Sequence, residues 1–240
     1  MEITPDTIVY GQWGLFRLNA TILYTWLLMV LLAFGSWLIT RNLSCGERIS
    51  RWQNLLEVLV SGIQSQIRGI GAQEPGPYLE FVGTLFLFVG LSNLLAIVPG
   101  FRPPTGSLST TAALSLCVFV AVPAYGIARG GFFGYLKNYI RPTVFMLPFN
   151  ILGELSRTVA LAVRLFGNIM SGTMIAGILI AIAPLFFPIL MSALGLLTGL
   201  IQAYIFAVLA MVYIASAAQA HREREIGLGE REAPTPSNHP

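Results

Sequence analysis

The region from Thr143 to Ala220 sets the tightest limit on the fold, because it is long and carries only three charged side chains, Glu154, Arg157 and Arg164. Segments of this length and apolarity are typical of helices that cross a lipid bilayer. The whole chain agrees, since 55% of its 240 residues are hydrophobic and 10% are charged, with a mean hydropathy of +0.72. The sequence therefore predicts an all-α polytopic membrane protein.

Hydropathy predicts about five membrane helices, of which the last two form a long hairpin with Pro184 and Pro188 at its turn. The expected spans are residues 21–40, 78–98, 108–128, 143–183 and 189–218. We assign residues 1–220 to a single membrane domain. Residues 221–240 are polar, and we expect them to form a disordered cytoplasmic tail.

Residues 48–68, between the first two spans, alternate apolar and polar side chains at helical spacing. This pattern predicts an amphipathic helix on the cytoplasmic surface of the bilayer. Basic residues gather on this same side of the spans, and only Arg17 and Arg102 fall on the other. The positive-inside rule therefore places the N-terminus outside and the C-terminus in the cytoplasm of a bacterial plasma (inner) membrane. Because the net charge of +3 reflects topology, no nucleic-acid partner is expected.

The first helix of the hairpin is too long for an upright span. Residues 149–183 contain no proline, so a continuous helix there would measure about 52 Å against a hydrocarbon core of about 30 Å. Either the helix breaks near Gly172 or Gly177, or it is strongly tilted. A tilted hairpin is suited to run alongside another molecule.

Arg164 is the residue that most needs an explanation, because a guanidinium stays charged and costs about 2.5 to 3.5 kcal/mol at the centre of a bilayer. Arg157, Asn168 and Ser171 lie on the same helical stripe. Glu154 lies three residues before Arg157, so these two can pair locally and leave Arg164 without a partner on its own helix. The structural alternative is an arginine that snorkels to the interface or neutralises a neighbouring acid.

Gln202 lies on the returning helix, about as far from the turn as Arg164, so antiparallel packing predicts that the two lie at comparable depth. Its amide could hydrogen-bond beside the guanidinium, or it could serve only as a polar clasp between helices. Gly195, Gly199 and Ala203 form a ridge of small residues that permits close helix contact.

Several of these segments together resemble subunit a of the rotary F-type ATP synthases, in order and over nearly the whole chain. They are Gln53-Asn-Leu-Leu-Glu57, Gly90-Leu-Ser-Asn93-Leu-Leu-Ala-Ile-Val-Pro99-Gly100, Leu161-Ala-Val-Arg164-Leu-Phe-Gly-Asn168 and Leu200-Ile-Gln202-Ala-Tyr-Ile-Phe206. The run Arg-Leu-Phe-Gly-Asn in a membrane helix is the most specific of them.

The resemblance implies an ion-translocating stator that faces a ring of c subunits, with peripheral-stalk b subunits and the lipid bilayer as further partners. Two half-channels would lead H⁺ or Na⁺ to carboxylates of the ring. Arg164 would match the essential arginine of the family and Gln202 its neighbouring glutamine, with Asn168 beside them. No cofactor or metal is expected, and ATP chemistry would belong to partner subunits, because the chain lacks a phosphate-binding Gly-x-x-x-x-Gly-Lys-Ser/Thr loop.

The chain departs from the family pattern where many members carry titratable residues. Thr173 stands in place of an acid and Gly195 in place of a histidine or acid, while the outer loop offers hydroxyls. The departures resemble the N-type branch of bacterial ATPases. The residues that we expect to line the half-channels are Ser107, Ser109, Thr110, Thr173, Asn93, Glu154 and Arg157.

Two other classes of function are weighed against the stator. One is a self-contained secondary transporter or anion channel that uses Arg164 as a charge clamp, and the other is a purely structural membrane scaffold. The sequence shows no inverted repeat and no pair of broken helices in matching halves, which disfavours the transporter. A scaffold leaves both Arg164 and the long hairpin unexplained.

Overall fold

The computed structural model describes residues 9–13, 16–41, 51–69, 76–98, 100–140, 146–182 and 187–232. Residues 48–50 of the predicted surface helix, residues 143–145 and 183–184 of the predicted hairpin, and Pro99 lie outside this part of the chain. The helices are α1 (Ala20–Thr40), α2 (Arg51–Gly69), α3 (Gly76–Leu95), α4 (Leu108–Ile140), α5 (Met146–Ile182) and α6 (Phe187–Glu232), and a short 3₁₀ turn η2 (Pro104–Gly106) precedes α4.

Five of these helices are long and apolar enough to cross a membrane, which confirms the predicted polytopic helical fold. The crossing segments are Ala20–Leu38, Tyr78–Leu95, Leu108–Ala128, Pro148–Ile182 and Ile189–Ser216. The sequence did not predict the small antiparallel hairpin of β1 (Val9–Trp13) and β2 (Phe16–Asn19) that precedes α1. Its valine and aromatic residues are types that favour strands.

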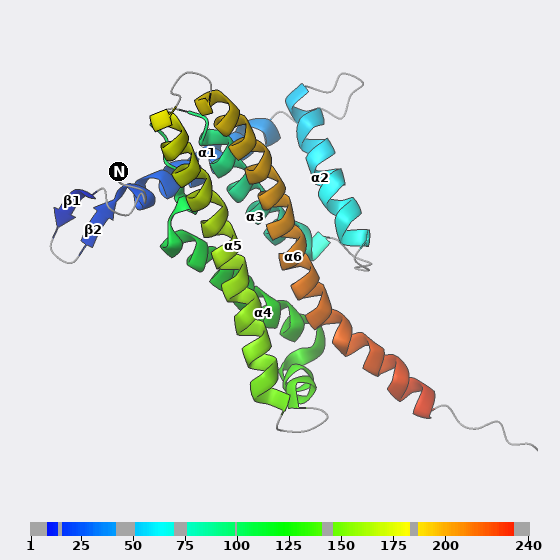
Figure 1. The fold of residues 1–240 in the computed structure, drawn as a ribbon. Coiled ribbons are helices and arrows are strands. Elements are labelled where there is room, and N and C mark those ends of the chain that lie inside the picture. The colour runs from blue at the N-terminus through cyan, green and yellow to red at the C-terminus, as the bar shows by residue number, and fades with distance from the viewer. Residues whose placement is uncertain are drawn as a thin grey trace, which may run out of the picture.

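Helices α5 and α6 form the long hairpin and lie side by side along the molecule (Figure 1). Helix α5 is a single helix of 37 residues, about 55 Å long at 1.5 Å per residue. It does not break at Gly172 or Gly177, so of the two alternatives only the continuous helix remains. A helix of this length can stay within a hydrocarbon core of about 30 Å only if it is strongly tilted.

Helix α6 continues beyond the membrane-length segment to Glu232, 46 residues in all (Figure 1). The expectation of a disordered tail from residue 221 was therefore wrong for residues 221–232. In the sequence Arg222 and Glu225 are three residues apart, a spacing at which opposite charges support a helix, and extending an existing helix needs no new nucleus. Residues 233–240 lie outside the described part.

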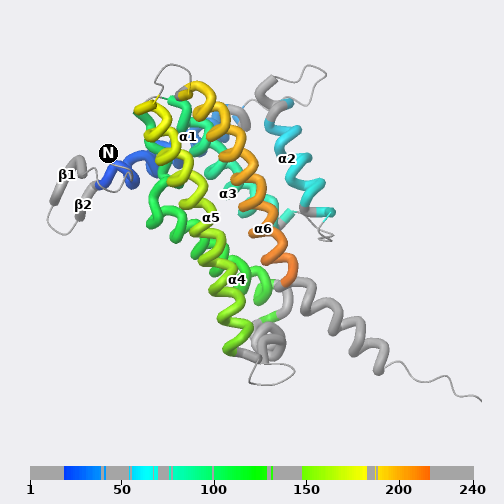
Figure 2. The backbone as a smooth tube through the Cα atoms, in the orientation of Figure 1, coloured from blue at the N-terminus to red at the C-terminus, as the bar shows by residue number. Residues whose placement is uncertain are grey.

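The core lies where α3, α4, α5 and α6 meet, and the tube view shows α5 and α6 running antiparallel in front of the other two (Figure 2). Val89, Val118, Leu165, Phe206 and Ile214 come from these four helices and are all at most 2% exposed. Helix α1 lies at the edge of the bundle and exposes large apolar side chains along most of its length, as expected of a surface that meets lipid.

Two of the three residues of the predicted small-residue ridge, Gly199 and Ala203, contact α3, whereas Gly195 does not. Gly90 of α3 faces Ala203, and the backbone of Gly199 is so close to Asn93 that the Asn93 side-chain amide donates a hydrogen bond of 2.8 Å to the Gly199 carbonyl. The bond gives a partner to an amide on a residue that is 96% buried. It also sets the position of α6 along the axis of α3.

Gly199→Ala should lower the melting temperature of the purified protein. A methyl group at this position would lie 2.8 Å from the Asn93 Cβ and 2.9 Å from its Cγ, and overpacking of this kind typically costs about 1 to 3 kcal/mol. The matched control is Gly195→Ala, whose methyl group meets no atom within 4 Å. Both changes raise helix propensity equally, so the difference between their melting temperatures isolates the contact, and equal values would contradict it.

Candidate functional site

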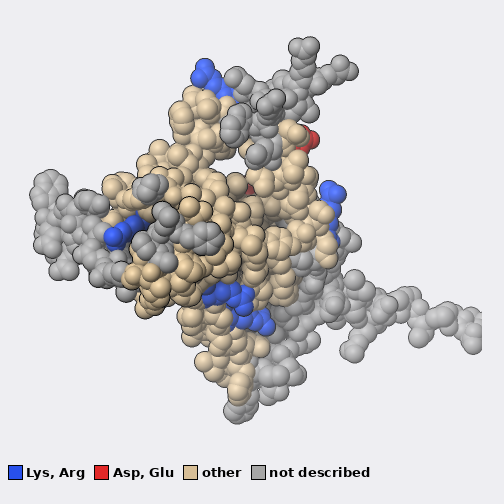
Figure 3. Space-filling view, turned by 45° about the horizontal axis from the view of Figure 1, so that its top comes forward, with Lys and Arg blue, Asp and Glu red and all other residues tan. Residues whose placement is uncertain are grey.

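Helix α5 buries one face and exposes the basic one. Leu161 and Leu165 are 2% and 1% exposed and turn into the core, whereas Arg157 and Arg164 are both exposed. In the space-filling view basic atoms form a small patch within an otherwise uncharged part of the surface (Figure 3). The two arginines therefore lie at the exposed edge of the face that α5 turns to the core.

Arg157 and Arg164 differ in what they contact. The Arg157 guanidinium lies over the ring of Tyr213 on α6, with its Cζ 5.4 Å from the ring centroid, and no ion pair joins it to Glu154 in the described structure. The expected local pair with Glu154 is therefore not formed. Arg164 makes no hydrogen bond, ion pair or cation–π contact with any residue that the structure describes.

The contact between Arg157 and Tyr213 fixes the register of the two antiparallel helices. Seven residues further along α5 is Arg164, and seven residues earlier along α6 is Phe206, so these two lie at about the same level. Gln202 is four residues from Phe206, or about 6 Å along the axis. The structure thus places Arg164 and Gln202 at similar depth along the hairpin.

Gln202 nevertheless turns away from the exposed face. Its side chain is 7% exposed, and its Nε2 is buried without a hydrogen-bond partner among the described residues. The hydrogen bond that we expected beside the guanidinium is therefore not formed in this structure. A buried amide without a partner costs about 1 to 3 kcal/mol, so Gln202 is a poor candidate for a stabilising clasp.

A cavity of about 480 Å³ opens between α5, α6 and the segment that joins α3 to α4. Asn93, Asn168 and Thr173, three of the predicted site residues, line this cavity. Its remaining polar lining is Arg102, Ser192 and Thr198, none of which was predicted to line a half-channel. The sequence could have suggested Arg102, because it is one of only two basic residues outside the clusters assigned to the cytoplasmic side.

The other predicted lining residues lie elsewhere. Ser107 is fully buried, with its Oγ 2.6 Å from that of Ser109, and neither these two nor Thr110 lines the cavity. The loop inserts η2 into the bundle, where a Cβ on Gly106 would lie 3.1 Å from the Ile169 side chain, and the serine hydroxyl turns inward. Glu154 and Arg157 lie towards the opposite end of α5 from the cavity and do not line it either.

Comparison with known proteins connects this arrangement to one family. Residues 22–215 match the family model described as ATP synthase A chain. The chain belongs to that family. Among its relatives are ATP synthase subunit a 2 of Acaryochloris marina, 64% identical over 91% of this chain and 94% of that protein, and ATP synthase subunit a of Albidiferax ferrireducens, 60% identical over 93% and 97%.

A third member of the ATP synthase A chain family, ATP synthase subunit a 1 of Prosthecochloris aestuarii, is 60% identical over 93% of this chain and the whole of that protein. Similarity over the full length of these relatives confirms the resemblance drawn from the Arg-Leu-Phe-Gly-Asn motif. The placement in the N-type branch stays a prediction.

The variant Gln202→Leu tests whether Gln202 holds α6 to its neighbouring helices or takes part in ion transport. Because the Nε2 has no partner to lose, we expect an unchanged or higher melting temperature together with a clear loss of ion-coupled activity in the assembled complex. Asn93→Leu is the control, since it removes an amide that does have a partner and should lower the melting temperature. A Gln202→Leu variant that is destabilised as strongly as Asn93→Leu would show that Gln202 is a clasp.

Proposed function

We propose that this member of the ATP synthase A chain family is the ion-translocating stator of a rotary ATP synthase or ATPase. The observation that carries the proposal is the outward-facing guanidinium of Arg164, which lies on an uninterrupted helix and has no partner among the described residues. A fixed charge in this position is stable in a membrane only if an anion or water from outside the described chain reaches it.

The anion that fits is a carboxylate on each c subunit of a ring that turns past α5. A carboxylate that faces lipid must be neutral, because an ionised one is very costly in hydrocarbon. Beside a guanidinium the charged form is favoured, so the carboxylate releases its H⁺ or Na⁺ there. Arg164 also repels cations and so blocks a direct leak, which couples ion flow to rotation.

The cavity of about 480 Å³ supports an outer half-channel that leads towards the level of Arg164. Asn93 offers one group in its wall that could bind a cation. The Asn93 Nδ2 donates to the Gly199 carbonyl, so the Oδ1 remains available as an acceptor. None of the described residues that line the cavity is Asp, Glu or His. The path is therefore suited to a hydrated proton or to Na⁺, and less to a relay of titratable groups.

The inner half-channel would open on the other side of Arg164. Glu154 is half-buried and Arg157 is exposed on the stretch of α5 that precedes Arg164, the stretch we place nearer the cytoplasm. We assign these two residues to that path, with the N-terminus of the chain outside and its C-terminus in the cytoplasm of a bacterial inner membrane. Peripheral-stalk b subunits would hold the stator still, and partner subunits would carry out ATP synthesis or hydrolysis.

The alternative of a self-contained transporter or anion channel finds less support. A substrate clamp should project into an enclosed, water-filled site, but Arg164 is exposed on the outer face of α5 and does not line the cavity. The guanidinium thus lies outside the cavity, one helical turn along α5 from Asn168 in its lining.

Arg164→Ala should abolish ATP-driven ion pumping by the reconstituted complex while its soluble head still hydrolyses ATP, because the ring carboxylates lose the charge that releases their ions. The assay follows ion uptake into vesicles and ATP hydrolysis in parallel. Arg68→Ala, which removes an equally exposed charge from the end of α2, is the control and should pump normally. Normal pumping by the Arg164→Ala variant would rule out the stator.

A further inference from the structure

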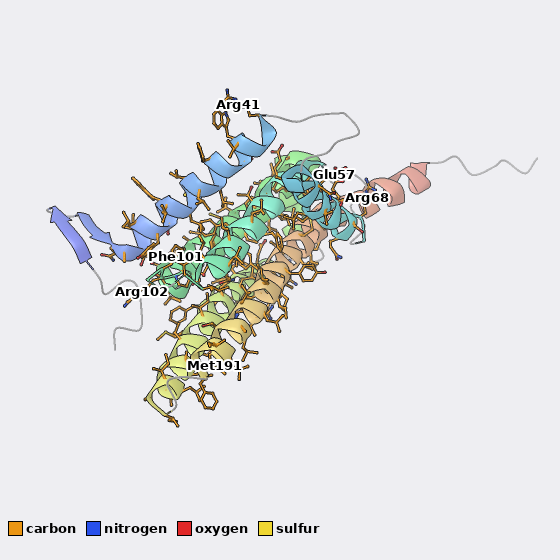
Figure 4. All side chains as sticks on the ribbon, turned by 90° about the horizontal axis from the view of Figure 1, so that it is seen from above. Arg41, Glu57, Arg68, Phe101, Arg102 and Met191 are labelled. Carbon is orange, nitrogen blue, oxygen red and sulfur yellow. The ribbon has the colours of Figure 1, made fainter. Side chains whose placement is uncertain are left out.

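Helix α2 has one polar face and one apolar face. Its exposed polar residues recur three or four positions apart and are Asn54, Glu57, Ser61, Ser65 and Arg68. Figure 4 shows two of them, Glu57 and Arg68, on α2. Leu59 and Ile63 lie on the opposite stripe and are half-buried. Among the described helices, α3 and α6 are apolar enough to cross a membrane and α2 is not. These features are typical of a helix at the surface of a bilayer, with its apolar face towards the hydrocarbon.

The apolar stripe of α2 is only partly covered by the neighbouring helices. Helix α2 packs against α3 but makes few contacts with α6 (Figure 1). A groove of about 220 Å³, which we call the α2 groove, lies between these three helices. Val58 on α2 and Tyr204 on α6 both line it and are 62% and 45% exposed. A Cβ on Gly62, in the same lining, would meet no atom within 4 Å. The apolar stripe therefore borders open space.

The α2 groove is unsuited to water. Of the described residues that line it, only Gln66 and Tyr204 have a polar side chain, and the others are apolar or glycine. A buried water needs about two to four polar partners, and apolar cavities without them stay dry. An empty groove would deprive its walls of dispersion contacts. In a membrane the groove should therefore hold an apolar occupant.

The size of the α2 groove excludes a further helix. On α2 the lining runs from Val58 to Gln66, eight residues along the helix, or about 12 Å. A helix segment of that length with a diameter of about 10 Å occupies about 900 Å³, which is about four times the volume of the groove. An apolar cavity of about 150 Å³ accepts a benzene molecule, so 220 Å³ has room for about nine carbon atoms. A bilayer supplies an occupant of this size and polarity in the form of a hydrocarbon chain.

We propose that the α2 groove binds an acyl chain of a membrane phospholipid, from the leaflet at whose surface α2 lies. The chain contacts the apolar stripe of α2 on one side and Phe86 and Val208 on the other. It thereby joins α2 to α6, which make few contacts with each other. The headgroup stays at the bilayer surface beside the polar face of α2. The proposal requires only that the protein lies in a membrane, so it does not rest on the stator function.

The α2 groove lies beside the part of α6 that is level with Arg164. Its lining on α6 runs from Tyr204 to Met211. Phe206, within this stretch, is at about the level of Arg164 in the register set by Arg157 and Tyr213. A chain bound in the groove therefore supports α6 at the depth of the exposed guanidinium.

The first test uses the unaltered complex and needs no variant. The complex is imaged by electron cryomicroscopy in vesicles of dioleoyl phosphatidylcholine and in vesicles of the same phospholipid with brominated chains. We expect chain-shaped density between Gly62 and Phe86, with extra scattering from bromine in the second sample. A helix of a partner subunit in the groove, or a groove without density, would overturn the proposal.

The second test fills the groove from within. Gly62→Leu adds four carbon atoms in a space where a Cβ meets no atom within 4 Å, so it should displace the acyl chain without a clash. Gly62→Ala is the matched control, because it also removes a helical glycine but adds a single carbon. Native mass spectrometry of the detergent-washed complexes counts the phospholipids that remain bound. The count should be lower by one molecule in Gly62→Leu than in Gly62→Ala, which should equal the parent protein.

Equal counts in an assembled Gly62→Leu complex would show that no phospholipid is held in the groove. The same comparison decides the case of chain-shaped density without bromine. A phospholipid that exchanges slowly with the vesicles is lost in Gly62→Leu, whereas another hydrophobic molecule leaves the phospholipid count unchanged and overturns the proposal. None of these results bears on the stator function, which is decided by Arg164→Ala.

Discussion

A guanidinium that cannot lose its proton has to meet an anion or water when its helix lies in a membrane, and the rest of this structure is arranged around that requirement. Leu161 and Leu165 bury the neighbouring face of α5, and Arg164 stays exposed with no partner among the described residues. The compensating anion or water must therefore come from outside the described part of the chain. In the proposed stator, an anion that arrives, exchanges its ion and moves on would couple the unfavourable charge to ion transport.

The hairpin and the cavity supply what such a device needs on either side. Helix α5 gives an unbroken surface of about 55 Å along which a partner can pass. Helix α3 packs closely against α6, where Asn93 contacts Gly199. A cavity lined mostly by apolar residues, with a few polar side chains among them, approaches the level of Arg164 without containing it. In the proposed stator this separation keeps the ion path and the fixed charge apart, and the passing partner would connect them.

Local hydrophobicity predicted most of the fold, because the length and apolarity of a membrane helix are properties of its own sequence. It could not predict how the loop between α3 and α4 is placed, since the burial of Ser107 depends on the insertion of η2 against Ile169 on a distant helix. The contact of Arg157 also depends on a distant helix. Spacing within α5 suggested Glu154 as its partner, but the packing of α6 against α5 places the Tyr213 ring under the Arg157 guanidinium. The predicted site residues Asn93, Asn168 and Thr173 line the cavity, but Arg102 was not predicted there, because its place depends on how the α3–α4 loop packs.

The central claim is that the partner of Arg164 is a carboxylate on a moving ring. The most direct test is a side-chain resolution electron cryomicroscopy map of the assembled complex in several rotational states. We predict that Arg164 faces the ring in every state and that one ring carboxylate at a time comes within about 4 Å of its guanidinium, the distance of an ion pair. A map in which Arg164 faces lipid, or pairs permanently with an acid of its own chain, would contradict the account.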